Sequence, residues 1–148
     1  MRPSGLRETR MMRELGFLRD FAKPHTAAWC SRDAASVAGF FAENGSLSVN
    51  GAPAVGQRAI TEVVQGFMTA FPNMELLMDD IHIESERAFY HWTFIGTNTG
   101  PGGTGHWVRF SGFEEWKIGE DELLTESQGH FDNADYQRQL KHGVEESL

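Results

Sequence analysis

The run from His106 to Phe131, HWVRFSGFEEWKIGEDELLTESQGHF, holds the carboxylate best suited to acid/base chemistry, Glu114. Two segments rich in aromatic and β-branched residues flank the polar turn GEDE, a pattern that predicts a long antiparallel hairpin. Because side chains alternate between the two faces of a strand, Glu114 shares one face with Phe110, Gly112 and Trp116. If that face lines a pocket, burial raises the pKa of the Glu114 carboxyl toward the range that an acid/base catalyst needs. On a solvated face the same carboxylate is an ordinary hydrated or ion-paired strand residue.

Two histidines are candidate proton carriers beside Glu114. His25 continues an apolar stripe at helical spacing that includes Leu18, Phe21 and Ala22, and it therefore belongs to the buried side of an amphipathic helix. A histidine there either carries protons near neutral pH or is a hydrogen-bonded residue of the core. His130 lies near the end of the predicted hairpin and is the second candidate.

Large aromatic side chains occur on the first predicted helix and on the inward faces of the predicted strands. They either line a pocket for a flat or apolar ligand or form plain core. The candidate ligand-binding residues are Trp29, Tyr90, Trp92, Phe94 and Trp116.

Other kinds of chemistry have little support in the residues. Asp80 and His82 share a strand face while Asp79 lies on the other, so too few ligands converge for a metal site. We expect no metal and no other cofactor. The glycine-rich stretch NTGPGGTG lacks a strand-to-helix context and a following lysine, which favours a plain loop over a phosphate cradle. Serine and cysteine nucleophiles have no evident base, which disfavours hydrolase chemistry.

Composition restricts the partners. The chain has 148 residues, 13 basic against 21 acidic side chains and a net charge of -8, which disfavours nucleic acid as a partner. Cys30 is the only cysteine, so an internal disulfide is excluded and a reducing compartment fits best. No apolar run approaches the ~18 residues of a membrane span, and the first residues do not resemble a signal peptide. We expect a cytoplasmic protein without a membrane partner.

The expected elements describe an α+β domain in which a curved sheet wraps around helices. Pro24 requires the first helix either to begin near it or to kink at it. The helices are expected before Ser31, over 34–41 and over 57–71, and the strands over 46–49, 54–55, 74–84, 87–99 and the two arms of the hairpin, with a last helical turn over 132–140. We expect an N-terminal extension over 1–15, one domain over 16–142 and a polar tail over 143–148.

Five segments, taken in order, resemble a known family. They are AAWCSRDAASVAGFFAENGSLSVNG, VGQRAI, FIGTNTG, VRFSGFEEWKI and RQL. Together they resemble the SnoaL-like polyketide cyclase branch of the NTF2-like superfamily, with its ketosteroid isomerase-like fold, from about residue 17 to residue 142. The resemblance implies a cone-shaped barrel of mostly antiparallel strands wrapped around about three helices, with a deep apolar pocket. It also implies a homodimer through the outer sheet face, where a second bulky stripe contains Phe89, His91, Thr93 and Ile95.

The resemblance extends to the fold but not to the family's catalytic residues. The family's catalytic aspartate falls on Gly129, or on His130 if the turn shifts by one residue, and the family's histidine falls on Trp116. A family tyrosine on the first helix is replaced by Trp29, and Asn98 stands where the family has a histidine. The position of Glu114 resembles that of an oxyanion-stabilising acid in ketosteroid isomerases.

Two functions therefore stay open. The first is an enzyme, a cyclase, isomerase or hydratase, that uses Glu114 with His25 or His130 on an apolar ring-type or polyketide-like substrate. The second is a non-catalytic binding module whose aromatic cone holds an apolar small molecule.

Overall fold

The computed structural model describes the backbone of residues 3–144 and the side chains of residues 13–144. The ends of the predicted extension and tail, residues 1–2 and 145–148, lie outside this range. The elements in chain order are α1 (Pro3–Cys30), α2 (Ala34–Ala38), β1 (Phe41–Val49), β2 (Ala52–Val55), α3 (Gln57–Ala70), β3 (Glu75–Glu84), β4 (Arg87–Thr97), β5 (Trp107–Ile118), β6 (Leu124–Phe131) and α4 (Asn133–His142).

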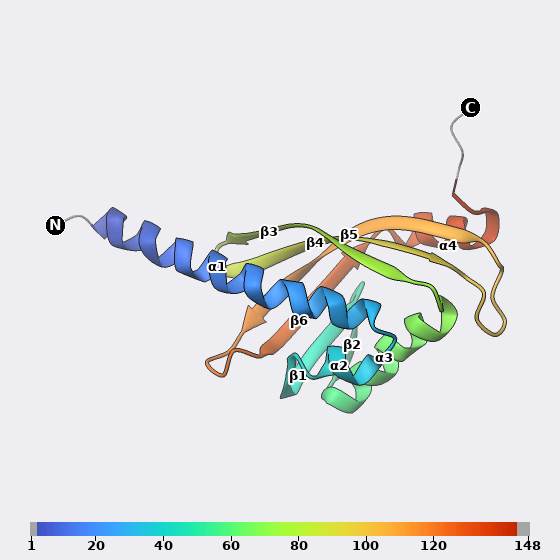
Figure 1. Ribbon diagram of the computed structural model, residues 1–148, viewed down its shortest axis with the longest axis horizontal. Coiled ribbons are helices and arrows are strands. Elements are labelled where there is room, and N and C mark those ends of the chain that lie inside the picture. Colours follow the sequence, from blue (N-terminus) through green and yellow to red (C-terminus); the bar gives the residue numbers. More distant parts are fainter. Residues whose placement is uncertain (1–2, 145–148) are drawn as a thin grey trace.

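The strands form one curved six-stranded sheet in the order β2-β1-β6-β5-β4-β3. Only β1 and β6 pair in parallel, and every other neighbouring pair is antiparallel. Helices α1, α2 and α3 lie along the same side of the sheet, while α4 follows β6 and packs by β5 (Figure 1). The predicted α+β fold with a curved, mostly antiparallel sheet is confirmed. The sheet stays open between its edge strands β2 and β3.

Helix α1 is longer than the sequence pattern suggested. It begins at Pro3, includes much of the predicted extension and continues past Pro24 to Cys30. Proline has no N–H to donate to the carbonyl four residues earlier, at Asp20. Asp20 is exposed, so water can satisfy that carbonyl.

The predicted boundary between the second helix and the first strand was wrong by several residues. Helix α2 ends at Ala38, where the Gly39 N–H donates to the Ala35 carbonyl and the Phe40 N–H donates to the Val37 carbonyl. Strand β1 then begins at Phe41, which pairs with Leu124 of β6. An irregularity between Phe41 and Ser46 interrupts the ladder, which explains why the segment AENG did not read as a strand.

The inner face of the sheet carries the core. The predicted alternation along β5 is confirmed, since Phe110, Glu114 and Trp116 are buried and Arg109 and Ser111 are exposed. On β4 the inward side chains are Ala88, Tyr90, Trp92 and Phe94. These two strands pair residue by residue over ten positions, from Ala88 with Trp116 to Thr97 with Trp107. This register places Glu114 beside Tyr90 and within a wall of aromatic rings.

Candidate active site

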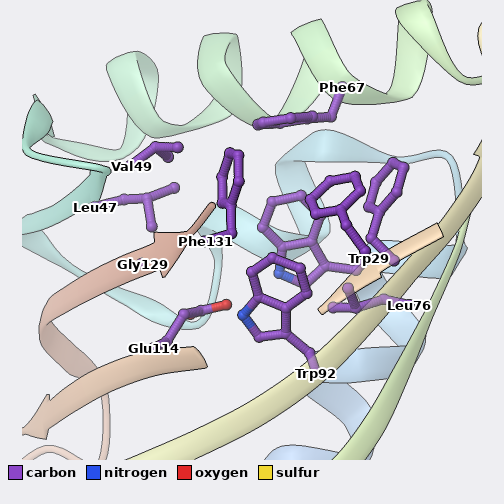
Figure 2. Close-up of a pocket in the computed structure, with 11 residues that line it drawn as sticks. Trp29, Leu47, Val49, Phe67, Leu76, Trp92, Glu114, Gly129 and Phe131 are labelled. Carbon is purple, nitrogen blue, oxygen red and sulfur yellow. The ribbon is translucent and has the colours of Figure 1, made fainter. Parts of the chain in front are cut away.

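A small apolar cavity lies between the inner face of the sheet and helices α1 and α3. Its volume is about 50 Å³. Of the described residues that line it, Glu114 alone is ionisable (Figure 2). The others are Trp29, Leu47, Val49, Phe67, Leu76, Trp92, Phe94, Phe110, Gly129 and Phe131.

Two hydrogen bonds, both to the same oxygen, fix the carboxyl of Glu114. Its Oε1 accepts hydrogen bonds from the Nε1–H of Trp116 at 2.9 Å and from the hydroxyl of Ser127 at 2.6 Å. The side chain is 6% exposed, and its carboxyl points into the cavity toward Trp92 (Figure 2). Since Oε1 already accepts two hydrogen bonds, Oε2 is the oxygen that can take up a proton or release it to a ligand.

Burial and hydrogen bonding act in opposite directions on this carboxyl. Removal from water raises the pKa of Glu114, and the hydrogen bonds from Ser127 and Trp116 lower it by a smaller amount. The cavity lining contains no lysine, arginine or histidine among the described residues, so no cation there stabilises the ionised form. Glu114 is therefore a buried acid whose neutral form is favoured more than in an ordinary surface glutamate.

Gly129 provides room next to this carboxyl. It lies opposite Glu114 in the β5–β6 ladder, and a Cβ atom added there would meet Glu114 Cγ at 3.8 Å and the carbonyl of Ser48 at 3.3 Å. A longer side chain at this position would occupy the cavity. Since Gly129 has no side chain, Glu114 is the only acid among the described residues of the lining.

Two indoles complete the lining with polar edges. Trp29 comes from α1 and Trp92 from β4, and these side chains are 8% and 7% exposed. The Nε1–H groups of both are buried, and neither has a hydrogen-bond partner among the described residues. Phe94, a third predicted ligand-binding residue, also lines the cavity.

Tyr90 and Trp116 lie behind Glu114 instead of in the cavity lining. Their rings stack at 4.6 Å between centroids, and the Tyr90 hydroxyl shares a short hydrogen bond with the Thr26 hydroxyl. Burial, together with the nearby Glu114 carboxyl, raises the pKa of Tyr90, so its phenol stays protonated. In this arrangement Trp116 positions the carboxylate and Tyr90 supports Trp116.

His25 is buried behind the same pair of rings. It contacts Trp116 and Tyr90 edge to face, with ring centroids 5.0 and 5.7 Å away, and it is not among the residues that line the cavity. Neither ring nitrogen has a hydrogen-bond partner in the described residues, and burial lowers the pKa of His25 to about 3. The structure therefore makes His25 a neutral core residue apart from Glu114.

His130 lies on the opposite face of the sheet from Glu114. It pairs with Phe113 in the ladder, and the two rings lie 5.0 Å apart. Its Nε2 is 3.9 Å from the carboxylate of Glu115, the outward neighbour of Glu114. The structure thus does not bring the two predicted proton carriers to one site with Glu114.

The sequence reasoning missed Ser127 and most of the aliphatic lining. Ser127 is fully buried, and it faces inward because it alternates with Gly129 and Phe131 on β6. That alternation was visible in the sequence. The partner of Ser127 across the hairpin was not, because the ladder shifts register between Lys117 and Ile118.

These features define a class of protein. It is an α+β domain in which an apolar pocket lies between a curved sheet and the helices, and Glu114 is the buried acid that lines this pocket. The family model for the SnoaL-like domain matches residues 22–127, and the chain belongs to this family. No curated protein matches the chain in sequence. In the part of the chain that the structure describes, no helix is both long and apolar enough to cross a membrane.

Solved structures with similar folds agree with this assignment. A protein with a ketosteroid isomerase-like fold from Catenulispora acidiphila, in complex with trimethylamine, is 15% identical, with a TM-score of 0.71 over 81% of this chain and 91% of that one. An NTF2-like protein from Exiguobacterium sp. 255-15 is 14% identical, with a TM-score of 0.66 over 76% and 98%. A protein described as a SnoaL-like polyketide cyclase, from Jannaschia sp. CCS1, is 11% identical, with a TM-score of 0.69 over 82% and 92%. At these identities the likeness shows the fold alone.

Proposed function

We propose that the chain is a small-molecule enzyme of the polyketide cyclase or isomerase type that moves protons on an apolar ring-type substrate. Glu114 is the acid/base group. The observation that carries the proposal is the buried carboxyl of Glu114, which points into an apolar cavity from a position fixed by Trp116 and Ser127.

The surroundings of Glu114 suit a group that both gives and takes a proton. Burial favours the neutral acid, which can donate from Oε2. The two hydrogen bonds to Oε1 remain in place after the proton leaves, and they stabilise the carboxylate that forms. The group can therefore donate a proton to one atom of a substrate and later recover one from another.

The cavity limits how a substrate enters. Its volume of about 50 Å³ exceeds the ~10–15 Å³ that a water needs, and it is well below the ~150 Å³ of a cavity that takes benzene. The reacting end of a substrate fits into the cavity with the side chains in their present positions. A whole ring enters only if an aromatic side chain of the lining rotates away.

His25 and His130 have no part in this proposal, because neither lines the cavity with Glu114. A second proton carrier, where the reaction needs one, would come from the substrate or from water that enters with it. Glu114 is thus the residue on which the enzymatic function depends.

The second candidate function is a non-catalytic binding module. The observation that favours it is that the positions of the family's aspartate and histidine fall on Gly129 and Trp116, neither of which exchanges protons. In that case the aromatic lining holds an apolar ligand and Glu114 contributes only to its orientation.

Turnover by a matched pair of variants separates the two functions. Apolar ring compounds are first screened for a rise in melting temperature, and each hit is then tested for isomerisation or cyclisation. Glu114→Gln keeps the size and the hydrogen-bonding shape of the side chain but cannot transfer the proton, so turnover should fall about 10²-fold or more with affinity little changed. Glu115→Gln is the control, because Glu115 faces the other side of the sheet near Arg87. Full turnover in Glu114→Gln would exclude the catalytic role, and binding without turnover of any hit would favour the binding module.

We also propose a homodimer through the outer face of the sheet. The bulky outward side chains Phe89, His91, Ile95 and Phe113 are only partly buried in the single chain. We expect a second copy of the chain to cover this stripe of partly exposed aromatic and aliphatic side chains.

A further inference from the structure

The mouth of the cavity lies on the side away from Glu114. Of the described residues that line the cavity, all are buried except Val49, Phe67 and Phe131, which are partly exposed. Figure 2 shows Phe67 on the α3 side of the cavity and Glu114 on the opposite side. The three partly exposed side chains therefore separate the cavity from solvent, and a ligand that reaches Glu114 passes between them.

Phe131 is firmly held at this mouth. Its backbone N–H donates a hydrogen bond to Asn50 Oδ1 at 2.9 Å. The centroid of its ring lies 5.1 Å from that of Phe110, 5.5 Å from that of Tyr136 and 6.0 Å from that of Trp92. Rotation of Phe131 out of the mouth would break close contacts with all three rings.

Phe67 is held less firmly. In the described part of the chain its ring neighbours are Trp29, at 6.4 Å between centroids, and Phe94, at 6.1 Å. Both distances are near the upper end of the ~4.5–7 Å range of aromatic contacts. The third mouth residue, Val49, is fixed in the sheet by strand pairing on both sides. Phe67 is therefore the mouth side chain whose movement breaks the weakest contacts.

The residue before Phe67 weakens the helix at this point. Gly66 lies inside α3, where a glycine destabilises a helix relative to alanine. Packing does not require a glycine here, because a Cβ atom added at Gly66 would meet no described atom within 4 Å. The sequence thus places an easily deformed turn directly beside Phe67.

Both ends of α3 are anchored to the rest of the domain. Gln57 Nε2 donates to the Phe41 carbonyl at 2.8 Å, and Asn98 Nδ2 donates to the Ala70 carbonyl at 3.1 Å. A helix that is fixed at both ends does not lift from the sheet as a whole. Movement of α3 is therefore local, at the turn that contains Gly66.

We propose that Phe67 is the gate of the cavity and thereby the residue that sets the size of the molecules that reach Glu114. The inference rests on the proposed function, because it concerns entry to the cavity of the same acid. A phenylalanine on a helix has two favoured χ1 values, about 180° and about −60°, so its ring can alternate between two directions. The turn at Gly66 deforms as the ring of Phe67 leaves the mouth.

Benzene exchange tests the gate without a known substrate. The closed cavity of about 50 Å³ is smaller than the ~150 Å³ of a cavity that takes benzene, so benzene enters only when the gate opens. NMR exchange between free and bound benzene gives the rate constants for binding and release. In Phe67→Leu both should increase by about 10-fold or more, because the smaller side chain leaves the mouth open.

The same substitution at two other phenylalanines provides the comparison. In Phe131→Leu the binding rate constant should stay within about 2-fold of the wild type, because Phe67 still closes the mouth. Phe40→Leu is the control, since Phe40 is also partly exposed but does not line the cavity.

Gly66→Ala tests the hinge without altering the lining. Binding and release of benzene should both slow by about 2- to 5-fold, the factor that corresponds to the cost of a glycine inside a helix, and the Kd should stay unchanged. Gly16→Ala is the matched control. Gly16 also lies inside a helix with open space for a Cβ atom, and it is remote from the cavity lining.

Three results would overturn the inference. They are faster exchange in Phe131→Leu but not in Phe67→Leu, wild-type rates in Gly66→Ala, and benzene binding in neither the wild type nor Phe67→Leu. Binding that appears only in Phe67→Leu would support the inference, because the wild-type gate then excludes benzene altogether.

The outcome is separable from that of the proposed function. Glu114→Gln should exchange benzene at the wild-type rate, because Glu114 lies opposite the mouth. Loss of turnover in Glu114→Gln, together with wild-type benzene rates in Phe67→Leu and Gly66→Ala, would leave the catalytic role standing and exclude the gate. Altered benzene rates in these two variants, with full turnover in Glu114→Gln, would exclude the catalytic role and leave the gate.

Discussion

Glu114 on β5 lies directly opposite Gly129 on β6, so the buried acid of the cavity faces the one inward position of β6 that lacks a side chain. The family resemblance assigns its catalytic aspartate to Gly129. The two positions are thus neighbours across one rung of the ladder. The carboxyl of Glu114 on β5 can therefore reach the part of the cavity that an aspartate at position 129 on β6 would fill.

Placing an acid at position 129 should make the two groups titrate together. In Gly129→Asp the new carboxyl would lie next to Glu114, and the described residues of the cavity lining include no cation. At least one pKa of the pair should therefore rise above that of Glu114 in the wild type. The free energy of unfolding near pH 7 should fall, because a second carboxyl is buried. Side-chain ¹³C NMR titration and urea unfolding measure both effects.

Gly129→Ala is the matched control for that experiment. Its Cβ fits 3.8 Å from Glu114 Cγ, and the contact of 3.3 Å with the Ser48 carbonyl requires only a small shift. It should narrow the cavity and weaken ligand binding while the Glu114 titration stays close to that of the wild type. A titration of Glu114 that is identical in the Asp and Ala variants would contradict the proximity argument.

Removing Ser127 should raise the pKa of Glu114 further. The Ser127 hydroxyl donates to Glu114 Oε1 and so favours the ionised carboxylate, an interaction that Ser127→Ala deletes. The pH at which activity or ligand binding changes should move upward with it, and stability should fall by about 1–2 kcal/mol. Carboxyl ¹³C titration gives the pKa, and Thr125→Ala, an exposed position on the same strand, is the control. A lower pKa in Ser127→Ala would show that this hydrogen bond does not act on the carboxylate.

The sequence predicted the elements that carry the site better than the contacts within it. Strand alternation correctly placed Glu114 on the inward face with Phe110 and Trp116, because a strand has a period of two whatever its partners. It could not show that this face contains two separate spaces. Trp116, stacked on Tyr90, lines a second groove beside residues 13–18 of α1 and does not line the cavity of Glu114. A residue next to Glu114 in the alternation thus lines a different space.

For the histidines too, the sequence pattern predicted burial but not the neighbouring residues. The helical stripe correctly predicted that His25 is buried, since helical spacing determines which face points inward. Whether its nitrogens find partners depends on residues brought from α1, β4 and β5, which no local pattern contains. For His130 the decisive fact was the register of β6, which places it opposite Phe113 on the outer face.

His25 should make the protein less stable at acid pH. Its pKa is lowered from 6.5 to about 3 by burial, so between these values the unfolded chain binds a proton that the folded chain does not. The contribution of His25 is fully present above pH 6.5 and decreases as the pH falls toward 3, with a slope of up to about 1.4 kcal/mol per pH unit.

Substitution isolates this contribution from that of the carboxylates. His25→Leu should remove the slope, and at pH 7 it should be at least as stable as the wild type, because two unpaired buried nitrogens are lost. Urea unfolding at intervals from pH 7.5 to pH 4.5 gives both quantities, with the exposed His142→Leu as the control. If the pH dependence of His25→Leu matches that of the wild type, the neutral buried state assigned to His25 is wrong.

The outer face of the sheet should join two copies of the chain. Phe113 is central there, since its ring lies 6.1 Å from Phe89, 5.8 Å from His91 and 5.0 Å from His130, all on neighbouring strands. Light scattering at micromolar protein should give the dimer mass for the wild type. Phe113→Glu should weaken association by about 30-fold or more, because it would bury an unpaired charge at the centre of an aromatic contact. Val55→Glu, on the exposed edge strand β2, should leave the mass unchanged. A monomer mass for the wild type would rule out the interface, and a dimer that persists in Phe113→Glu would place it elsewhere on the molecule.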